Sequence, residues 1–180
     1  MRAAARAANV SHMAPYRHFP DKEAMLAAIA EAGFVRLRTA MDAASATTSE
    51  PLSSMLGVGH AYIGFARANP ALYRLMFSAA APDRARHPGL DEASRAAYER
   101  CAGGVARAFG VNNSGESARA AAVATWAMVH GIASLLIDNR IELAGDPGAE
   151  TRLVDSVLRL HGAGLNAASR TGSLPKPGRP

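Results

Sequence analysis

The sequence predicts an all-α protein, and three observations support this. Apolar residues recur at intervals of three and four along most of the chain, as in helices with one buried face. β-branched residues are sparse, and no long stretch alternates between apolar and polar residues as a half-buried strand does. The composition is 49% hydrophobic but only 6% aromatic and rich in alanine, which favours closely packed helices. With 180 residues, the chain suffices for one domain, or a small pair, with a real core.

The N-terminal residues indicate two short helices joined by a turn. Residues 2–8 are strong helix formers, and Asn9 tolerates the left-handed conformation that ends a helix. Ser11 is a good N-cap for a second helix over residues 11–18. This helix must stop near Phe19, because the residue before a proline is driven out of the α region.

Longer helices follow. We expect them over residues 21–46, from Pro51 to the break at Asn69, over 70–77, 91–109 and 116–143, and finally around Leu153 to Leu165. The stripe predicted to be buried in the first of these helices consists of Leu26, Ile29, Gly33, Leu37 and Met41. Residues 80–89 are expected to form a mobile loop and residues 111–115 a turn.

The predicted helix over residues 11–18 carries chemistry suited to DNA. Its hydrogen-bond donors are His12, Tyr16, Arg17 and His18. Ala14 and Pro15 are small enough to approach a base edge, and Lys22 lies at a helix N-terminus, where a phosphate is favoured. Phe19 is expected to pack in the core, and core packing is an equal alternative for Tyr16. Each histidine taken alone is more simply an ordinary solvated side chain.

The run from Val10 to Leu26, VSHMAPYRHFPDKEAML, closely resembles the signature of TetR/AcrR-family transcriptional regulators. The resemblance implies a recognition helix over residues 11–18, phosphate contacts from Tyr16, His18 and Lys22, and base contacts from the exposed side of the helix. The DNA-binding residues predicted on this basis are Ser11, His12, Ala14, Pro15, Tyr16, His18 and Lys22. Asn9 stands where the family usually has glycine and can replace it conformationally.

A further departure concerns the helix that precedes the helix-turn-helix in this family, for which Met1 leaves no room. A three-helix DNA-binding module cannot bury its core with one helix absent. Either the start has been placed too late in the reading frame, or the chain is a truncated paralogue with impaired DNA binding. We favour the first interpretation, because the rest of the motif has not decayed.

The expected helix over residues 116–143 is apolar on nearly every side, which suggests a subunit interface. Trp126 and His130-Gly131 resemble the WHG-type ligand-binding C-terminal domain of one TetR subgroup. The last two helices are expected to form a four-helix bundle with their symmetry mates, giving a homodimer. The expected organisation is a partial helix-turn-helix region and connecting helix over residues 1–45, a helical ligand-binding and dimerisation domain over 46–168, and a disordered tail over 169–180.

A TetR-like body would bring several large side chains around one cavity. The ligand-binding residues predicted are His60, Phe65, Met76, Phe77, Tyr98, Trp126 and His130, with Tyr62 beside them. Apolar walls with a few polar groups suit a small hydrophobic or aromatic effector. For each residue the alternative is ordinary core packing. His130 is the best candidate for a polar ligand contact, although a histidine satisfied by a backbone carbonyl is an equal alternative.

The charge distribution agrees with this organisation. Residues 1–22 carry four Arg and Lys against one Asp, whereas residues 23–168 carry thirteen basic and fourteen acidic residues. A basic end suits phosphate contacts, and a near-neutral body suits a sensor. Cys101 is the only cysteine, so no disulfide framework is possible; it is expected to be a buried small hydrophobe rather than a redox sensor. No signal peptide or apolar run long enough to cross a membrane was identified, and a cytoplasmic protein is expected.

The sequence contains no motif that indicates an enzymatic function. No histidine pair has metal-ligand spacing with nearby Cys or carboxylates, and no P-loop, GxGxxG or GxSxG motif is present. No catalytic residue, metal or cofactor is predicted. The favoured function is a ligand-responsive repressor that binds a pseudo-palindromic double-stranded DNA operator as a homodimer. The alternative is a helical dimer that binds a small ligand or a partner but not DNA, because its DNA-binding region is truncated.

Overall fold

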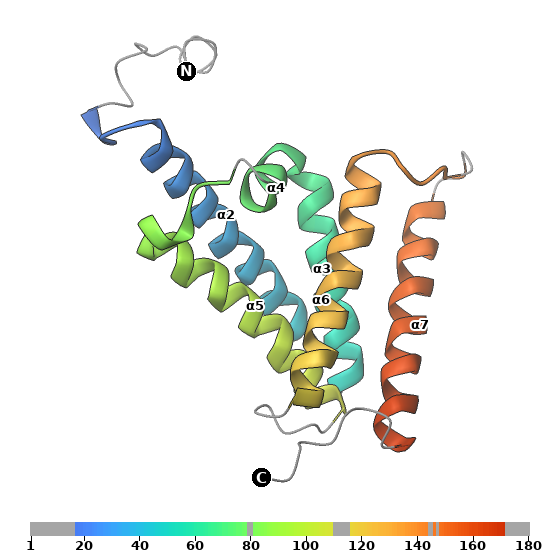
Figure 1. Ribbon diagram of the computed structural model, residues 1–180. Coiled ribbons are helices and arrows are strands. Elements are labelled where there is room, and N and C mark those ends of the chain that lie inside the picture. Colours follow the sequence, from blue (N-terminus) through green and yellow to red (C-terminus); the bar gives the residue numbers. More distant parts are fainter. Residues whose placement is uncertain (1–16, 79–80, 110–115, 144–145, 147, 172–180) are drawn as a thin grey trace.

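The computed structural model describes residues 17–78, 81–109, 116–143, 146 and 148–171 (Figure 1). Within these residues the regular elements are all helical, so the predicted all-α class is confirmed. The helices are α2 (Lys22–Ser45), α3 (Pro51–Ala68), α4 (Pro70–Phe77), α5 (Pro88–Phe109), α6 (Glu116–Ile137) and α7 (Ala149–Thr171), with a 3₁₀ turn η2 (Arg84–Arg86). Most of the helix expected over residues 11–18, and nearly all of the tail, lie outside the described residues.

The starts of three helices follow from local chemistry, as predicted. Asp21 caps α2, with its Oδ1 accepting a hydrogen bond from the Ala24 amide at 2.8 Å. α3 and α4 begin at Pro51 and Pro70, where the missing N–H of proline removes no helical hydrogen bond. Glu50 caps α3 through its carboxylate, and its acceptor role lowers the pKa of that side chain.

The expected end of the helix over residues 116–143 was wrong, because α6 stops at Ile137. Asn139 adopts a left-handed conformation with φ of 51°. The Arg140 amide donates to the Leu135 carbonyl at 2.8 Å, and the Asn139 amide donates to Leu136 at 3.2 Å. This pair of bonds is the Schellman arrangement, which satisfies the last carbonyls and ends the helix.

The interpretation of residues 80–89 as a loop also needs correction. Residues 84–86 form the turn η2, which begins where Asp83 Oδ1 accepts from the Ala85 amide at 3.0 Å. α5 then starts at Pro88 rather than Asp91. The last helix continues to Thr171, so the first residues expected in the tail belong to α7.

The core lies between α2, α3, α5 and α6, with α4 packed against α2 (Figure 1). The most completely buried large side chains are Tyr73, Leu37, Met41, Leu90, Val105 and Val129. The stripe predicted for α2 was partly wrong: Ile29 is 42% exposed, whereas Phe34 is 3% exposed. The buried positions are Ala27, Ala30, Gly33, Phe34, Leu37 and Met41. The buried face of α2 therefore packs against α3, α4 and α5.

α6 is long and apolar enough to cross a membrane, so the expectation that no such stretch exists was too strict. Its position explains its composition. Val129, Ala133 and Leu136 are buried in the main core, and the helix packs against both α3 and α5. α6 is accordingly a core helix of the helical body, and some of its apolar side chains are left exposed.

Candidate functional site

Two cavities adjoin inside the helical body. The larger has a volume of about 270 Å³ and lies between α2, α5 and α6, and the smaller, of about 180 Å³, lies beneath α4 and η2. The side chains that line both are Phe34, Phe77, Arg84 and Trp126. The two cavities therefore adjoin, with these side chains as the wall between them.

The structure brings together most of the residues predicted to bind a ligand. Tyr98, Phe77 and Trp126 line the larger cavity, and Met76, Phe77, Trp126 and His130 line the smaller one. Tyr62 also lines the larger cavity. That these residues bind a ligand stays a prediction.

Two predicted residues lie elsewhere. His60 is directed toward α7, with its Nε2 3.5 Å from Asp155 Oδ1. Phe65 is buried in the main core, and the guanidinium of Arg36 lies 5.9 Å from its ring centroid. Neither side chain lines the two cavities.

Other cavity residues were missed by the sequence analysis. Phe34 lies on the buried stripe of α2, and its spacing from Leu37 and Met41 could have revealed it. Arg84 lies in the segment that was expected to be a mobile loop. No sequence pattern indicated that this arginine would line a cavity.

The aromatic walls are closely packed. Phe34 meets Phe77 edge-to-face with ring centroids 5.2 Å apart, and Tyr98 meets Trp126 edge-to-face at 5.9 Å. The His130 ring contacts one ring of each pair, with its centroid 4.8 Å from that of Phe77 and 5.7 Å from that of Trp126. These contacts fix the shape of an apolar site that contains a few polar groups, as in small-molecule sites.

Three polar side chains next to the aromatic rings contact one another: Tyr62, Tyr73 and His130. Tyr73 Oη lies 2.6 Å from His130 Nδ1, and Tyr62 Oη lies 3.2 Å from the same nitrogen and 3.3 Å from Tyr73 Oη. Burial lowers the pKa of His130, so the ring is neutral at pH 7. Burial raises the pKa of Tyr73 to about 12 and raises the pKa of Tyr62 as well, so both phenols keep their protons.

These protonation states are compatible with one simple set of hydrogen bonds. In the tautomer of His130 that carries its proton on Nε2, Nδ1 accepts the Tyr73 hydroxyl proton at 2.6 Å. No described residue accepts a hydrogen bond from this N–H. The smaller cavity thus has a polar donor in its wall.

Cys101 borders the larger cavity and is buried, as predicted. Burial raises the pKa of its thiol to about 11. The thiol is therefore protonated at pH 7 and behaves as a small apolar side chain, because the thiolate is the reactive form.

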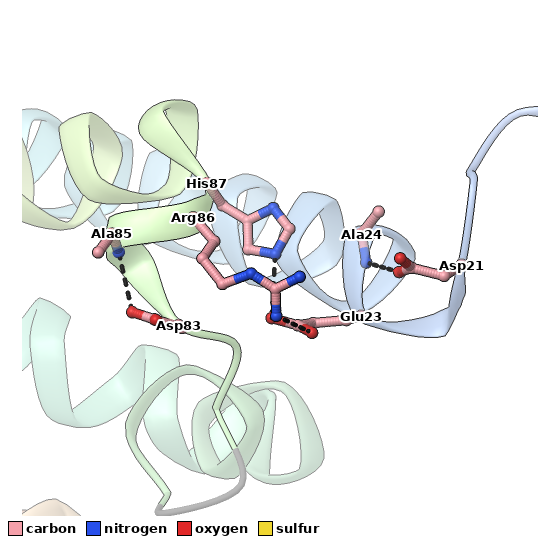
Figure 2. A network of polar contacts seen from close by, with 7 residues as sticks. All are labelled: Asp21, Glu23, Ala24, Asp83, Ala85, Arg86 and His87. Carbon is pink, nitrogen blue, oxygen red and sulfur yellow. Dashed lines mark hydrogen bonds and ion pairs between the residues drawn. The ribbon is translucent and has the colours of Figure 1, made fainter.

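Figure 2 shows how η2 is joined to α2. The Glu23 carboxylate accepts hydrogen bonds from Arg86 Nη1 at 2.8 and 3.1 Å, and His87 Nε2 lies 3.4 Å from its Oε1. We call Glu23, Arg86 and His87 the Glu23 cluster. Arg84, at the cavity, belongs to the same turn as Arg86. One short segment therefore contacts both the cavity and the first turn of α2.

The stability of the fold is expected to fall as the pH is lowered toward about 5.5. Burial lowers the pKa of His130 and of His161 below the usual 6.5. The folded protein then binds fewer protons than the unfolded chain at pH values just below 6.5, so protonation favours unfolding. Because both rings are only half-buried, solvent screening keeps the effect of each small. Urea denaturation between about pH 7.5 and 5.5 measures the slope.

The matched variant for this measurement is His161→Gln. Thr125 donates its hydroxyl proton to the Ala121 carbonyl at 2.9 Å, so it accepts from His161 Nε2, also at 2.9 Å. A glutamine amide can also donate but does not titrate in this range. The variant should show a smaller slope, and an unchanged slope would contradict the assignment of His161 as a titrating group.

Two residues of the predicted DNA-binding set are described. His18 and Lys22 are both exposed, and Lys22 is the first residue of α2. The other predicted residues, Ser11, His12, Ala14, Pro15 and Tyr16, lie outside the described residues. The described part of the segment thus places an exposed lysine at the start of α2.

An exposed apolar surface runs along α6 and α7. Val123 and Leu135 on α6 are 43% and 46% exposed, and Leu160 on α7 is 76% exposed. Gly131 and Gly164 lie on the same helices, and a Cβ placed on either would meet no atom within 4 Å. We call these five residues the α6–α7 surface.

Comparison with known proteins agrees with this architecture. The profile of the family described as "Tetracyclin repressor-like, C-terminal domain" matches residues 55–160. The solved structure of a protein with unknown function from Rhodococcus sp. RHA1 is 32% identical, with a TM-score of 0.70 over 93% of this chain and 82% of that one. A comparison with curated proteins finds no match.

The helical body and its aromatic cavity belong to a domain of the type found in TetR-like regulators. The chain belongs to the family of proteins with a tetracyclin repressor-like C-terminal domain. The resemblance to TetR-type regulators is therefore confirmed for this domain, and the family is generally non-enzymatic.

Proposed function

We propose that this protein is a ligand-responsive transcriptional regulator, a repressor, which binds a pseudo-palindromic DNA operator as a homodimer. One observation carries the proposal. The turn η2 lines both cavities through Arg84 and contacts Glu23, in the first turn of α2, through Arg86. That end of α2 adjoins the segment that resembles a recognition helix.

The effector would occupy the two adjoining cavities. Their walls are aromatic, with Phe34, Phe77 and Trp126 shared between them. A small hydrophobic or aromatic molecule gains most from such walls, because it exchanges water for apolar contact.

The signal would pass from the cavity to α2 through η2. An effector that contacts Arg84 displaces the turn, which also carries Arg86 and is followed by His87. Their contacts with Glu23 then change, and the first turn of α2 moves. Such a movement alters the separation of the two DNA-binding segments in a dimer, and operator affinity falls. Coupling between sites in proteins is typically about 5- to 150-fold in affinity.

The dimer would form through the α6–α7 surface. Its exposed leucines and valine are large apolar side chains with no cover in a single chain. Gly131 and Gly164 would let the helices of a second copy approach closely. An isologous four-helix arrangement buries all of these residues on both subunits at once.

Selection of binding sequences from random duplex DNA by the wild-type protein tests the proposal. We expect enrichment of a pseudo-palindromic sequence, with log affinity falling steeply against log salt. Lys22→Ala should weaken binding to the selected sequence and lower the salt slope by about one. Arg107→Ala, which removes an exposed charge from the last turn of α5, is the matched control and should leave binding unchanged.

Absence of any enriched sequence, together with weak and sequence-blind binding, would overturn the regulator proposal. A dimer that still binds small ligands under these conditions would instead be a non-DNA-binding sensor. Operator affinity that is equal for the wild type and Lys22→Ala would contradict the assignment of Lys22 as a phosphate contact.

A further inference from the structure

We propose that the effector carries a carboxylate and that Arg84 is its anchor. The inference rests on the proposed effector site and specifies the chemical class of its ligand as a small aromatic monocarboxylate. Three observations support the inference: the charge balance of the cavity, the hydrogen bonding of Arg84, and the aromatic residues that line the cavity.

Arg84 is the only side chain that gives the cavity an uncompensated charge. The charged residues that line the larger cavity are Arg84, Asp91 and Arg95. Asp91 and Arg95 form an ion pair with each other. In the smaller cavity Arg84 is the single charged lining residue. Within the described part of the chain, no carboxylate lies within ion-pair distance of Arg84, so the cavity as a whole is positive.

Arg84 is an exposed residue that lines the cavity, and within the described part of the chain one of its guanidinium nitrogens makes a hydrogen bond. Its Nη1 donates to Ser94 Oγ at 3.0 Å, and the Ser94 hydroxyl in turn donates to the Asp91 carbonyl at 2.9 Å. Ser94, the partner of this hydrogen bond, is only 5% exposed. A guanidinium has five N–H donors in a planar fork, and the remaining donors of Arg84 match the two oxygens of a carboxylate.

The other arginines of this region differ from Arg84. Arg86 is paired with Glu23, and Arg95 is paired with Asp91. Both therefore have their charge balanced within the protein. Arg84 lies on the same turn as Arg86, yet it faces the cavity and has only a neutral serine as its side-chain partner.

A second donor lies in the wall of the same cavity. His130 lines the smaller cavity with Arg84, and its Nε2–H has no acceptor among the described residues. A ligand oxygen can accept from this group. A donor and a cation facing one small cavity favour an acceptor-rich anion over a neutral hydrocarbon.

The remainder of the ligand would be an aromatic ring. Phe34, Phe77 and Trp126 line both cavities and surround the space next to Arg84. The larger cavity of about 270 Å³ exceeds the roughly 150 Å³ that accommodates benzene in an engineered protein cavity. A single ring with a short acidic substituent therefore fits.

Trp126 supplies the readout, because it is the only tryptophan and borders both cavities. We would titrate the wild-type protein with two matched pairs, benzoate against benzamide and phenylacetate against phenylacetamide, and follow Trp126 fluorescence and the heat of binding. We expect at least one carboxylate to bind about 10- to 100-fold more tightly than its amide, because an ionised acceptor roughly doubles the strength of each hydrogen bond. This preference should decrease with added salt.

Arg84→Gln should remove the preference of the site for the carboxylate while leaving binding of the amide nearly unchanged. Arg84→Lys should keep part of the preference, because the charge stays but the planar fork is lost. Arg107→Gln is the charge-matched control on α5 and should behave like the wild type. The salt dependence of the wild-type preference tests the same idea without any variant, in case Arg84→Gln fails to fold.

Two outcomes would overturn the inference in different ways. If amides and carboxylates bind the wild type equally, or if Arg84→Gln retains the full preference, the assignment of Arg84 as a carboxylate anchor is wrong. The assignment of the cavities as the effector site is then unaffected. If none of the four compounds changes Trp126 fluorescence or releases heat, both the carboxylate anchor and the assignment of these cavities as an aromatic effector site fail.

Discussion

Replacement of Leu160 by arginine is expected to convert the proposed dimer into monomers. Leu160 is 76% exposed in the single chain and lies on the proposed interface. A two-fold interface contains each residue twice, so the substitution places two positive charges in an apolar contact. A buried charge without a partner costs several kcal/mol, and we expect the dimer dissociation constant to rise by about 100-fold or more.

Sedimentation equilibrium at several protein concentrations measures this change directly. Val35→Arg is the matched control, because Val35 is 47% exposed on α2, away from α6 and α7. The control should remain dimeric. A Leu160→Arg protein with the wild-type dissociation constant would show that the α6–α7 surface is not the interface. A wild-type protein that stays monomeric at high concentration would reject the dimer altogether.

Loss of the dimer also has a functional consequence. A dimer binds two half-sites at once, whereas a monomer contacts one half-site and loses the effective concentration that linkage provides. Leu160→Arg should therefore weaken binding to a selected operator without any change in the DNA-binding residues. Effector binding should persist, because Leu160 does not line the cavities.

Local signals in the sequence were sufficient to place most helix starts. Asp21, Pro51 and Pro70 determine the beginnings of α2, α3 and α4 through capping and the special geometry of proline. These effects act within one turn of the chain, so they are visible without tertiary information. The end of α6 is also determined by a local signal. Asn139 follows the helix, and asparagine readily takes the left-handed conformation.

Which face of a helix is buried was harder to predict. α2 contains many alanines, so several stripes have a similar apolar character. Ile29 was placed on the buried stripe but is exposed, because α3 and α5 cover the face that carries Phe34 and Leu37. The choice between stripes depends on packing partners that are distant in the sequence.

The same limit applies to the candidate site. Trp126 and His130 are four residues apart on one helix and were predicted to share a face, which they do at the smaller cavity. His60 was placed in the same group, but the direction of α3 turns it toward Asp155 on α7. Arg84 was missed because its position depends on the turn η2 and on Ser94 in α5.

Tyr73→Phe is expected to lower the free energy of unfolding by about 1–2 kcal/mol. Tyr73 is 2% exposed, and its hydroxyl donates to His130 Nδ1 at 2.6 Å. Removal of the hydroxyl leaves a buried acceptor without its nearest donor. Tyr62 Oη, at 3.2 Å from the same nitrogen, can replace part of this bond. The cost therefore stays below the roughly 3 kcal/mol of a fully unsatisfied group.

Urea denaturation at neutral pH measures this loss, and two further variants make it specific. Tyr98→Phe is the matched control, because no described residue hydrogen-bonds to the Tyr98 hydroxyl, and its stability should stay within about 0.5 kcal/mol of the wild type. In Tyr62→Phe/Tyr73→Phe no phenol remains to donate to His130, so the loss should exceed the sum of the two single losses. An additive double variant would mean that Tyr62 does not replace Tyr73, and that His130 Nδ1 finds its donor in water entering from the adjoining cavity.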